Sequence, residues 1–231
     1  MTTIHTPGAP YEPIALPNRT EVTAPERAQR AEAFFENMAK RHTVRDFAPT
    51  PVPQRVIAAC IATAGRAPSG ANHQPWHFCA VSDAGVKKRL RDAAEAQERA
   101  FYEGRAGEKW LEDLTPLGTN SDKSFLEIAP WVIVVFAERY GIHGNGESHK
   151  NYYVQESAGI ATGFLLAALH HAGLSTLSYT PAPMGFLSEI CARPENERPY
   201  MVIVAGLPAE DATIPKKSTV KKSLDEVASF L

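Results

Sequence analysis

The spacing of hydrophobic residues predicts alternating helices and strands. Apolar residues at helical spacing follow Thr23-Ala24-Pro25-Glu26, which has the composition of a capping box, and again follow Pro53. A third helix is predicted after Ser82 or Asp83. A fourth, over residues 152–171, is apolar nearly all round in its second half and is therefore expected to be central. Short apolar runs predict strands at residues 76–81, 131–137, 174–178 and 200–206.

Three stretches lack these periods. Residues 1–22 are rich in Pro and Thr, which predicts an extended N-terminal arm, either wrapped around a neighbouring subunit or loosely ordered. Residues 95–125 mix charged and small residues with Gly and Pro, which is typical of a lid over a binding site. Residues 141–146 are predicted to form a glycine-rich loop. Residues 23–231 are expected to form a single domain that carries the lid.

Composition narrows the function classes. With 231 residues, 44% of them hydrophobic, and a formal charge of −2, the chain is an ordinary globular protein in which neither nucleic acid nor a membrane is the expected partner. Cys60, Cys79 and Cys191 show no paired spacing and lie in apolar runs, so we expect them to be reduced, buried and structural. The longest apolar run is too short to span a bilayer, and the expected location is the cytoplasm.

Two short segments carry candidate chemistry. Arg41-His42-Thr43-Val44-Arg45 places two guanidinium groups four residues apart, and on a helical end both could face one anion such as a phosphate. The stretch from Ala67 to Trp76 contains a Pro-Ser-Gly turn, which lets a flat ligand approach the main chain closely. Taken singly, a pair of arginines near a helix end is more often a solvated face, and a Pro-Ser-Gly sequence is usually only a turn.

Together the two segments resemble the flavin-binding segments of the nitroreductase superfamily. The resemblance implies an α+β fold, with a central mixed or antiparallel sheet flanked by helices, built as an intertwined homodimer with FMN at the subunit interface. The residues that it implies for FMN binding are Arg41, His42, Thr43 and Arg45, then Pro68, Ser69 and Gly70 of the turn, then Ser178, Tyr179 and Thr180, and finally Lys221 near the C-terminus.

Glu98, Tyr102 and Lys123 form the most informative constellation. Glu98 and Tyr102 are four residues apart and so share one face of a helix, and Lys123 follows the broken segment. By spacing alone, a solvated helix and a surface lysine explain them. The same residue types at the same spacing are similar to the substrate clamp of the iodotyrosine deiodinase branch of the superfamily. That resemblance implies that Glu98 accepts a hydrogen bond from the substrate ammonium, Lys123 meets its carboxylate, and Tyr102 adds a hydrogen bond and apolar cover.

The resemblance also implies two catalytic groups. The hydroxyl of Thr180 would donate to flavin N5, which favours stepwise electron transfer over hydride transfer. The backbone N–H of Ala71 would hold the substrate phenolate, as in an oxyanion hole. Three departures from the family pattern are visible: His42 replaces a second arginine, Lys221 or Lys222 replaces a C-terminal arginine, and Ser178-Tyr179 replaces smaller hydroxyl residues.

The expected activity is FMN-dependent reductive dehalogenation of halotyrosines, from iodotyrosine to tyrosine and iodide. Two alternatives stay open: a general FMN nitroreductase or quinone reductase, and a flavin-binding protein without turnover. No nicotinamide-binding motif is visible, so the electron donor is open, with NAD(P)H acting through a separate reductase as one possibility. His143 and His149 lack a zinc-site spacing, and no metal is expected.

Overall fold

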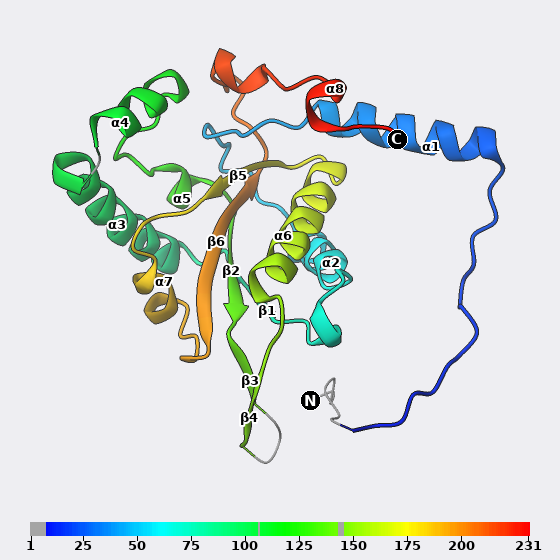
Figure 1. Cartoon of the computed structure of the whole chain (residues 1–231). Helices are drawn as coiled ribbons and strands as arrows, with labels where there is room; N and C mark the ends of the chain where they lie inside the picture. Colours follow the sequence, from blue (N-terminus) through cyan, green and yellow to red (C-terminus); the bar gives the residue numbers. More distant parts are fainter. Residues whose placement is uncertain (1–7, 106, 143–145) are drawn as a thin grey trace.

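A central sheet separates two layers of helices in the computed structural model, which describes residues 8–105, 107–142 and 146–231 (Figure 1). The strands are β1 (Trp76–Val81), β2 (Trp131–Glu138), β3 (Tyr140–Ile142), β4 (Ser148–Lys150), β5 (Ser175–Tyr179) and β6 (Glu197–Gly206). The α-helices are α1 (Ala24–Ala39), α2 (Gln54–Ala64), α3 (Ala84–Ala100), α4 (Glu108–Leu114), α5 (Phe125–Ile128), α6 (Val154–His171), α7 (Gly185–Ile190) and α8 (Leu224–Val227). The short helical turns are η1 (Gly70–Asn72), the π-helix η2 (Phe101–Arg105), η3 (Thr115–Leu117) and η4 (Lys216–Thr219).

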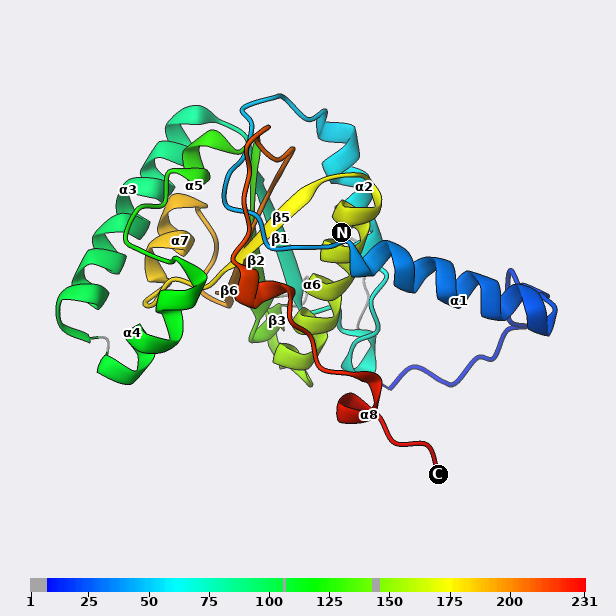
Figure 2. The same ribbon diagram turned by 90° about the horizontal axis from the view of Figure 1, so that it is seen from above.

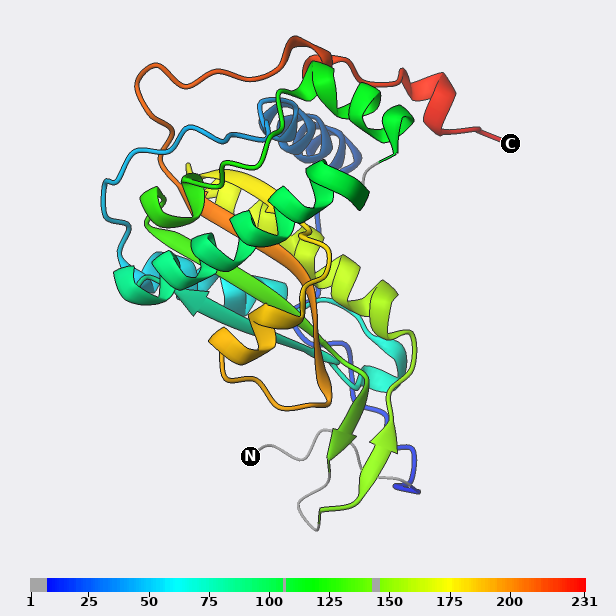
Figure 3. The ribbon, with the colours of Figure 1, turned by 90° about the vertical axis from the view of Figure 1, so that its left-hand side faces the viewer.

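The main sheet has the strand order β1-β2-β6-β5, and every neighbouring pair in it is antiparallel. Helices α2 and α6 cover one face, and α3, α5 and α7 cover the other, as Figure 2 shows from above. The prediction of an α+β fold with a central sheet flanked by helices is therefore confirmed. Strands β3 and β4 form a separate hairpin that extends beyond the end of the main sheet (Figure 3).

Strand β2 is buried on both faces, and its alternation divides the core. Val132, Val134 and Phe136 pack with α3, α5 and α7, whereas Ile133 and Val135 pack with α2 and α6. An uninterrupted apolar run is expected for a strand that has helices on both sides. The core therefore has two halves, one on each face of the sheet.

The predicted helix starts are confirmed in detail. Thr23 and Glu26 form a complete capping box at the start of α1, and Asp83 accepts a hydrogen bond from the Val86 backbone N–H at 2.8 Å. Gly173, directly after the C-cap of α6, has φ +81°, which an L side chain rarely adopts.

The conformation of residues 41–45 contradicts one prediction. The sequence pattern placed them on a helical end, but α1 stops before Lys40 and the following chain runs beside the sheet. Thr43 forms an isolated parallel bridge with Thr176, and the Val44 backbone N–H donates to the Thr176 carbonyl at 3.1 Å. A pairing with a distant strand has replaced the local helix, because it satisfies backbone groups that a finished helix leaves open.

Three further expectations need correction. Residues 141–142, predicted to lie in a loop, belong to β3, while residues 143–145 of that loop lie outside the described residues. Helix α6, expected to be central, is covered on one side only within this chain: Leu165 and Leu169 are buried, whereas Ile160 and Phe164 are exposed on its outer side. Of the three cysteines, only Cys60 is buried; the other two are half-buried.

Outside the core, residues 8–22 contain no helix or strand and are almost wholly exposed (Figure 1). The first seven residues of the predicted arm lie outside the described residues. Helix α1 projects from the body, and none of its residues is buried. Within the described residues, no helix is both long and apolar enough to cross a bilayer.

Candidate active site

A cleft of about 690 Å³ opens between the C-terminal end of α3, the segment that follows it, and the end of β5. Segments far apart in the sequence meet here, because β5 ends beside α3 and the chain between α3 and α5 covers them both. The sequence-predicted residues that line the cleft are Arg45, Glu98, Tyr102, Lys123, Ser178, Tyr179 and Thr180.

The carboxylate of Glu98 lies at the centre of the polar contacts. Its Oε2 is 3.3 Å from Lys123 Nζ, and its Oε1 accepts a hydrogen bond from the Tyr179 hydroxyl at 2.9 Å. The Glu98 and Lys123 side chains are 14% and 7% exposed. Two opposite charges thus face the cleft from positions largely removed from water, where their field on a ligand is weakly screened.

Several contacts fix Lys123. Its ammonium also donates to the carbonyl of Asn120, and its backbone N–H donates to Glu95 Oε1 at 3.0 Å. Burial lowers the pKa of Lys123, and the nearby Glu98 carboxylate opposes that shift. The Glu98 carboxylate therefore helps the buried ammonium of Lys123 to stay protonated.

The aromatic wall comes from the segment predicted as a lid. Tyr102 donates to Thr119 Oγ1 at 3.3 Å, and the ring of Phe101 meets Trp110 edge to face, with centroids 5.9 Å apart. Gly107 begins α4 and Gly118, at φ +63°, ends η3, so two of the glycines that interrupt the sequence pattern are helix boundaries. Aromatic cover of this kind suits a flat ring.

The end of β5 brings hydroxyl groups to the opposite side. Ser178 and Thr180 are exposed at the cleft, while Tyr179 between them turns its side chain toward Glu98. Arg45 lines the same cleft, and burial lowers its pKa. These groups offer hydrogen-bond donors and a positive charge along one side of the cleft.

Arg41 and His42 line a second pocket of about 290 Å³ together with Lys40 and His170. The two arginines of the first motif therefore open into different hollows, and the prediction that both face one anion from a helical end is wrong for this chain alone. The second pocket collects several basic groups, which is the composition expected of an anion site.

The Pro-Ser-Gly turn does not line the cleft of its own chain. Ser69 accepts a hydrogen bond from the Gln74 backbone N–H at 2.9 Å, and a Cβ on Gly70 would lie 2.8 Å from the Tyr152 carbonyl oxygen. Pro68 and Ala71 are exposed, and Ala71 has φ 49°. The small residue at position 70 thus permits contact with the start of α6. Lys221 and Lys222 are exposed in the C-terminal tail and also lie outside the cleft lining.

Sequence reasoning missed several cleft residues. Phe101, Leu114, Phe125 and Met184 line it. Tyr179 was predicted only for flavin binding, and its part in the charged cluster was missed. Phe101 and Phe125 each lie within two residues of a predicted site residue, so that proximity was an available signal. No periodicity links Tyr179 to Glu98, since they come from different elements.

Comparisons with known proteins agree with this geometry. The model of the nitroreductase family matches residues 38–207. A curated relative from Haliscomenobacter hydrossis, an iodotyrosine deiodinase, is 50% identical over 190 residues, covering 82% of this chain and 86% of its own length. The human iodotyrosine deiodinase 1 is 39% identical over 203 residues, or 87% of this chain and 70% of its own length.

Among solved structures, an oxidised iodotyrosine deiodinase bound to FMN and 3-iodo-L-tyrosine superposes with a TM-score of 0.70 at 30% identity, covering 83% of this chain and 96% of that one. The family match spans most of the chain, and the relatives match along most of their own length. This chain therefore belongs to the iodotyrosine deiodinase branch of the nitroreductase family.

Proposed function

We propose that this protein catalyses FMN-dependent reductive dehalogenation of halotyrosines. The observation that carries the proposal is the largely buried pair of opposite charges, Glu98 and Lys123, in a cleft with aromatic walls. A free amino acid carries an ammonium and a carboxylate close together, and this pair offers one partner to each. A nitroaromatic or a quinone has neither charge and gains nothing from such a pair.

The residues present fit FMN. A flavin needs an anion site for its phosphate and donors along its ring, and the chain offers a basic pocket with Arg41 and His42, and a cleft edge with Arg45 and Thr180. Thr43, between the two arginines, pairs with Thr176 of β5 and completes the set of residues that we assign to FMN in this segment. When bound, the reduced flavin would supply the two electrons that the dehalogenation consumes.

Each clamp residue recognises a different part of the substrate. Glu98 accepts from the ammonium, Lys123 meets the carboxylate, and Tyr102 covers the bound amino acid from the lid side. Each ligand charge then has an opposite protein charge, and water leaves the cleft as the aromatic wall packs on the ring. The carbon–iodine bond breaks, iodide leaves, a proton is added at the ring carbon, and the flavin is oxidised.

The site is completed by a second copy of the chain. The turn with Pro68, Ser69, Gly70 and Ala71 lies outside the cleft lining of its own chain, so it reaches a flavin only across an interface. Exposed apolar side chains support such an interface: Phe34 and Phe35 on α1, Ile160 and Phe164 on α6, and Val220, Leu224, Val227 and Phe230 in the tail. The Ala71 N–H would then hold the substrate phenolate, and Lys221 or Lys222 would approach the phosphate.

The test is anaerobic. The purified protein is loaded with FMN, reduced stoichiometrically with dithionite and mixed with 3-iodotyrosine, and flavin reoxidation is followed together with iodide release. We expect equal amounts of both, with loss of reaction in Lys123→Ala. Reoxidation by a nitroaromatic but not by 3-iodotyrosine would assign the general nitroreductase activity, and reoxidation by neither would leave a flavin-binding protein. A cytoplasmic location and a nicotinamide-dependent reductase as electron donor stay predictions.

A further inference from the structure

The resemblance assigns Ser178, Tyr179 and Thr180 to flavin binding. The side chain of Tyr179, however, contacts the charged pair on the other side of the cleft. Its hydroxyl donates to Glu98 Oε1 at 2.9 Å, and Lys123 Nζ lies 5.5 Å from the centre of its ring. One tyrosine thus touches both charges of the clamp.

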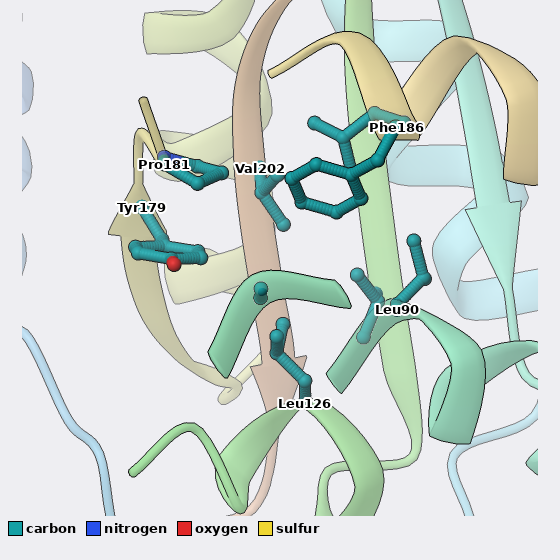
Figure 4. Close-up of a pocket in the computed structure, with 9 residues that line it drawn as sticks. Leu90, Leu126, Tyr179, Pro181, Phe186 and Val202 are labelled. Carbon is teal, nitrogen blue, oxygen red and sulfur yellow. The ribbon is translucent and has the colours of Figure 1, made fainter. Parts of the chain in front are cut away.

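The ring of Tyr179 is held firmly. It meets Phe125 edge to face, with centroids 6.0 Å apart. Figure 4 shows it beside Pro181 at one side of a small apolar cavity that Leu126 and Val202 also line. Apolar packing on one side and a charged partner at the hydroxyl leave the ring little freedom to rotate.

The hydroxyl acts as a donor at any physiological pH. Burial raises the pKa of Tyr179 above its ordinary value, and the adjacent Glu98 carboxylate raises it further, so the phenol keeps its proton. The Tyr179 hydroxyl therefore remains a hydrogen-bond donor to Glu98 Oε1. Its Oε2 is left to face cations, of which Lys123 is one.

We propose that Tyr179 is a positioning residue that fixes Glu98 and Lys123 in their ligand-accepting arrangement, and so sets the preference of this cleft for zwitterionic amino acids. The inference rests on the proposed function and deepens it. An arriving amino acid adds its ammonium beside Glu98 and its carboxylate beside Lys123. The four charges then alternate in sign, and Tyr179 has already fixed the orientation of the carboxylate at their centre.

The test compares two substrates in Tyr179→Phe, which keeps the ring and removes only the hydroxyl. 3-Iodotyrosine carries the ammonium and carboxylate, whereas 2-iodophenol carries neither. We expect kcat/KM for 3-iodotyrosine to fall about tenfold further than kcat/KM for 2-iodophenol, mainly through KM, as for the loss of one hydrogen bond to a charged group. Equal falls for the two substrates would overturn the proposal, because damage to the flavin site or to folding affects both alike.

Two controls sharpen the result. Tyr140→Phe removes a tyrosine hydroxyl outside the cleft lining and should leave the ratio of the two substrates unchanged. In a Glu98→Gln background, Tyr179→Phe should add less than about a twofold further effect, because its partner is already altered. Full additivity would contradict the proposal.

The proposed function fails separately, if the wild-type protein releases no iodide from 3-iodotyrosine. In that case the quenching of flavin fluorescence by 3-iodotyrosine and by 2-iodophenol still compares their affinities in both proteins. A loss of affinity in Tyr179→Phe confined to the zwitterion supports the positioning role, and an equal loss overturns it.

Discussion

Lys123 Nζ and Glu98 Oε2 lie 3.3 Å apart, with side chains only 7% and 14% exposed. A largely buried ion pair adds little net stability over an apolar pair, but removing one partner strands the other charge. The pair thus suits binding better than folding, because a ligand that supplies both charges keeps each partner satisfied.

Glu98→Gln should destabilise the protein although it only replaces one carboxylate oxygen by an NH2 group. The ammonium of Lys123 keeps its burial and loses its carboxylate, so its pKa falls further and the free energy of unfolding drops by about 2–4 kcal/mol. Urea unfolding measures this. Glu103→Gln, an exposed neighbour on η2, should change stability by less than about 0.5 kcal/mol, and equal effects for the two variants would refute the argument.

Glu138 should make stability depend on pH. It lies opposite Glu197 in the β2–β6 pairing, and burial, followed by the charge of Glu197, raises the pKa of Glu138 to about 7 from an ordinary 4.5. The folded state therefore binds a proton more tightly than the unfolded chain between these values, and this group lowers stability as pH rises through them.

The variant Glu138→Gln tests that sign. We expect it to match wild type near pH 4, below the ordinary pKa of 4.5, where Glu138 is largely protonated in the folded and unfolded states alike, and to be more stable by about 1–3 kcal/mol near pH 8. Chemical denaturation at the two pH values supplies the comparison. A difference that does not change with pH would show that the carboxyl titrates normally.

Cys79 should be the reactive thiol of the chain. A hydrogen bond from Cys191 stabilises its thiolate and, against the effect of burial, lowers the pKa of Cys79 to about 7. Alkylation by iodoacetamide, followed by mass spectrometry, should reach half its limiting rate near that pH. In Cys191→Ala the midpoint should move upward, while Cys60, whose pKa burial raises, should react slowly in both proteins. An unchanged midpoint in the variant would exclude the hydrogen bond as the cause.

Gly70→Ala should destabilise the fold, because the added methyl group would collide with Tyr152 and Tyr153. An added Cβ would lie 2.8 Å from the Tyr152 carbonyl oxygen and 2.9 Å from Tyr153 Cδ2. We expect a loss of about 1–3 kcal/mol in thermal or urea unfolding, together with weaker FMN retention as the turn shifts. Gly185→Ala, where nothing lies within 4 Å of the new Cβ, is the matched control and should be close to neutral.

The predictable part of the fold was local. Thr23 with Glu26, and Asp83, stand at helix starts because their side chains satisfy backbone groups within three residues, and such contacts can be read from spacing. The strand after Pro130 was predictable from its continuous run of apolar residues. The run is continuous because helices pack on both faces of this strand. The helix start signals and the apolar run each involve residues that are close together in the sequence, so the sequence alone is enough to predict them.

The unpredicted part depends on contacts between distant segments. The bridge of Thr43 to Thr176 turned an expected helical end into extended chain, and no local pattern encodes that partner. The same holds for Tyr179, whose contact with Glu98 joins β5 to α3. The resemblance supplied Glu98, Tyr102 and Lys123 as a set, whereas the residue that links two of them had to come from the structure.

Helix α1 contains 16 residues and buries none of them within its own chain; its C-terminal end is held by His170, which contacts the Asn37 carbonyl at 2.8 Å. A helix of that length is marginal in water, because nucleation is costly and only a packed face normally offsets it. The helical state of α1 is therefore linked by mass action to whatever covers Phe34 and Phe35. If a second copy covers them, as we propose, the helical state of α1 would depend on protein concentration, and dilution would melt α1 while the central sheet persists.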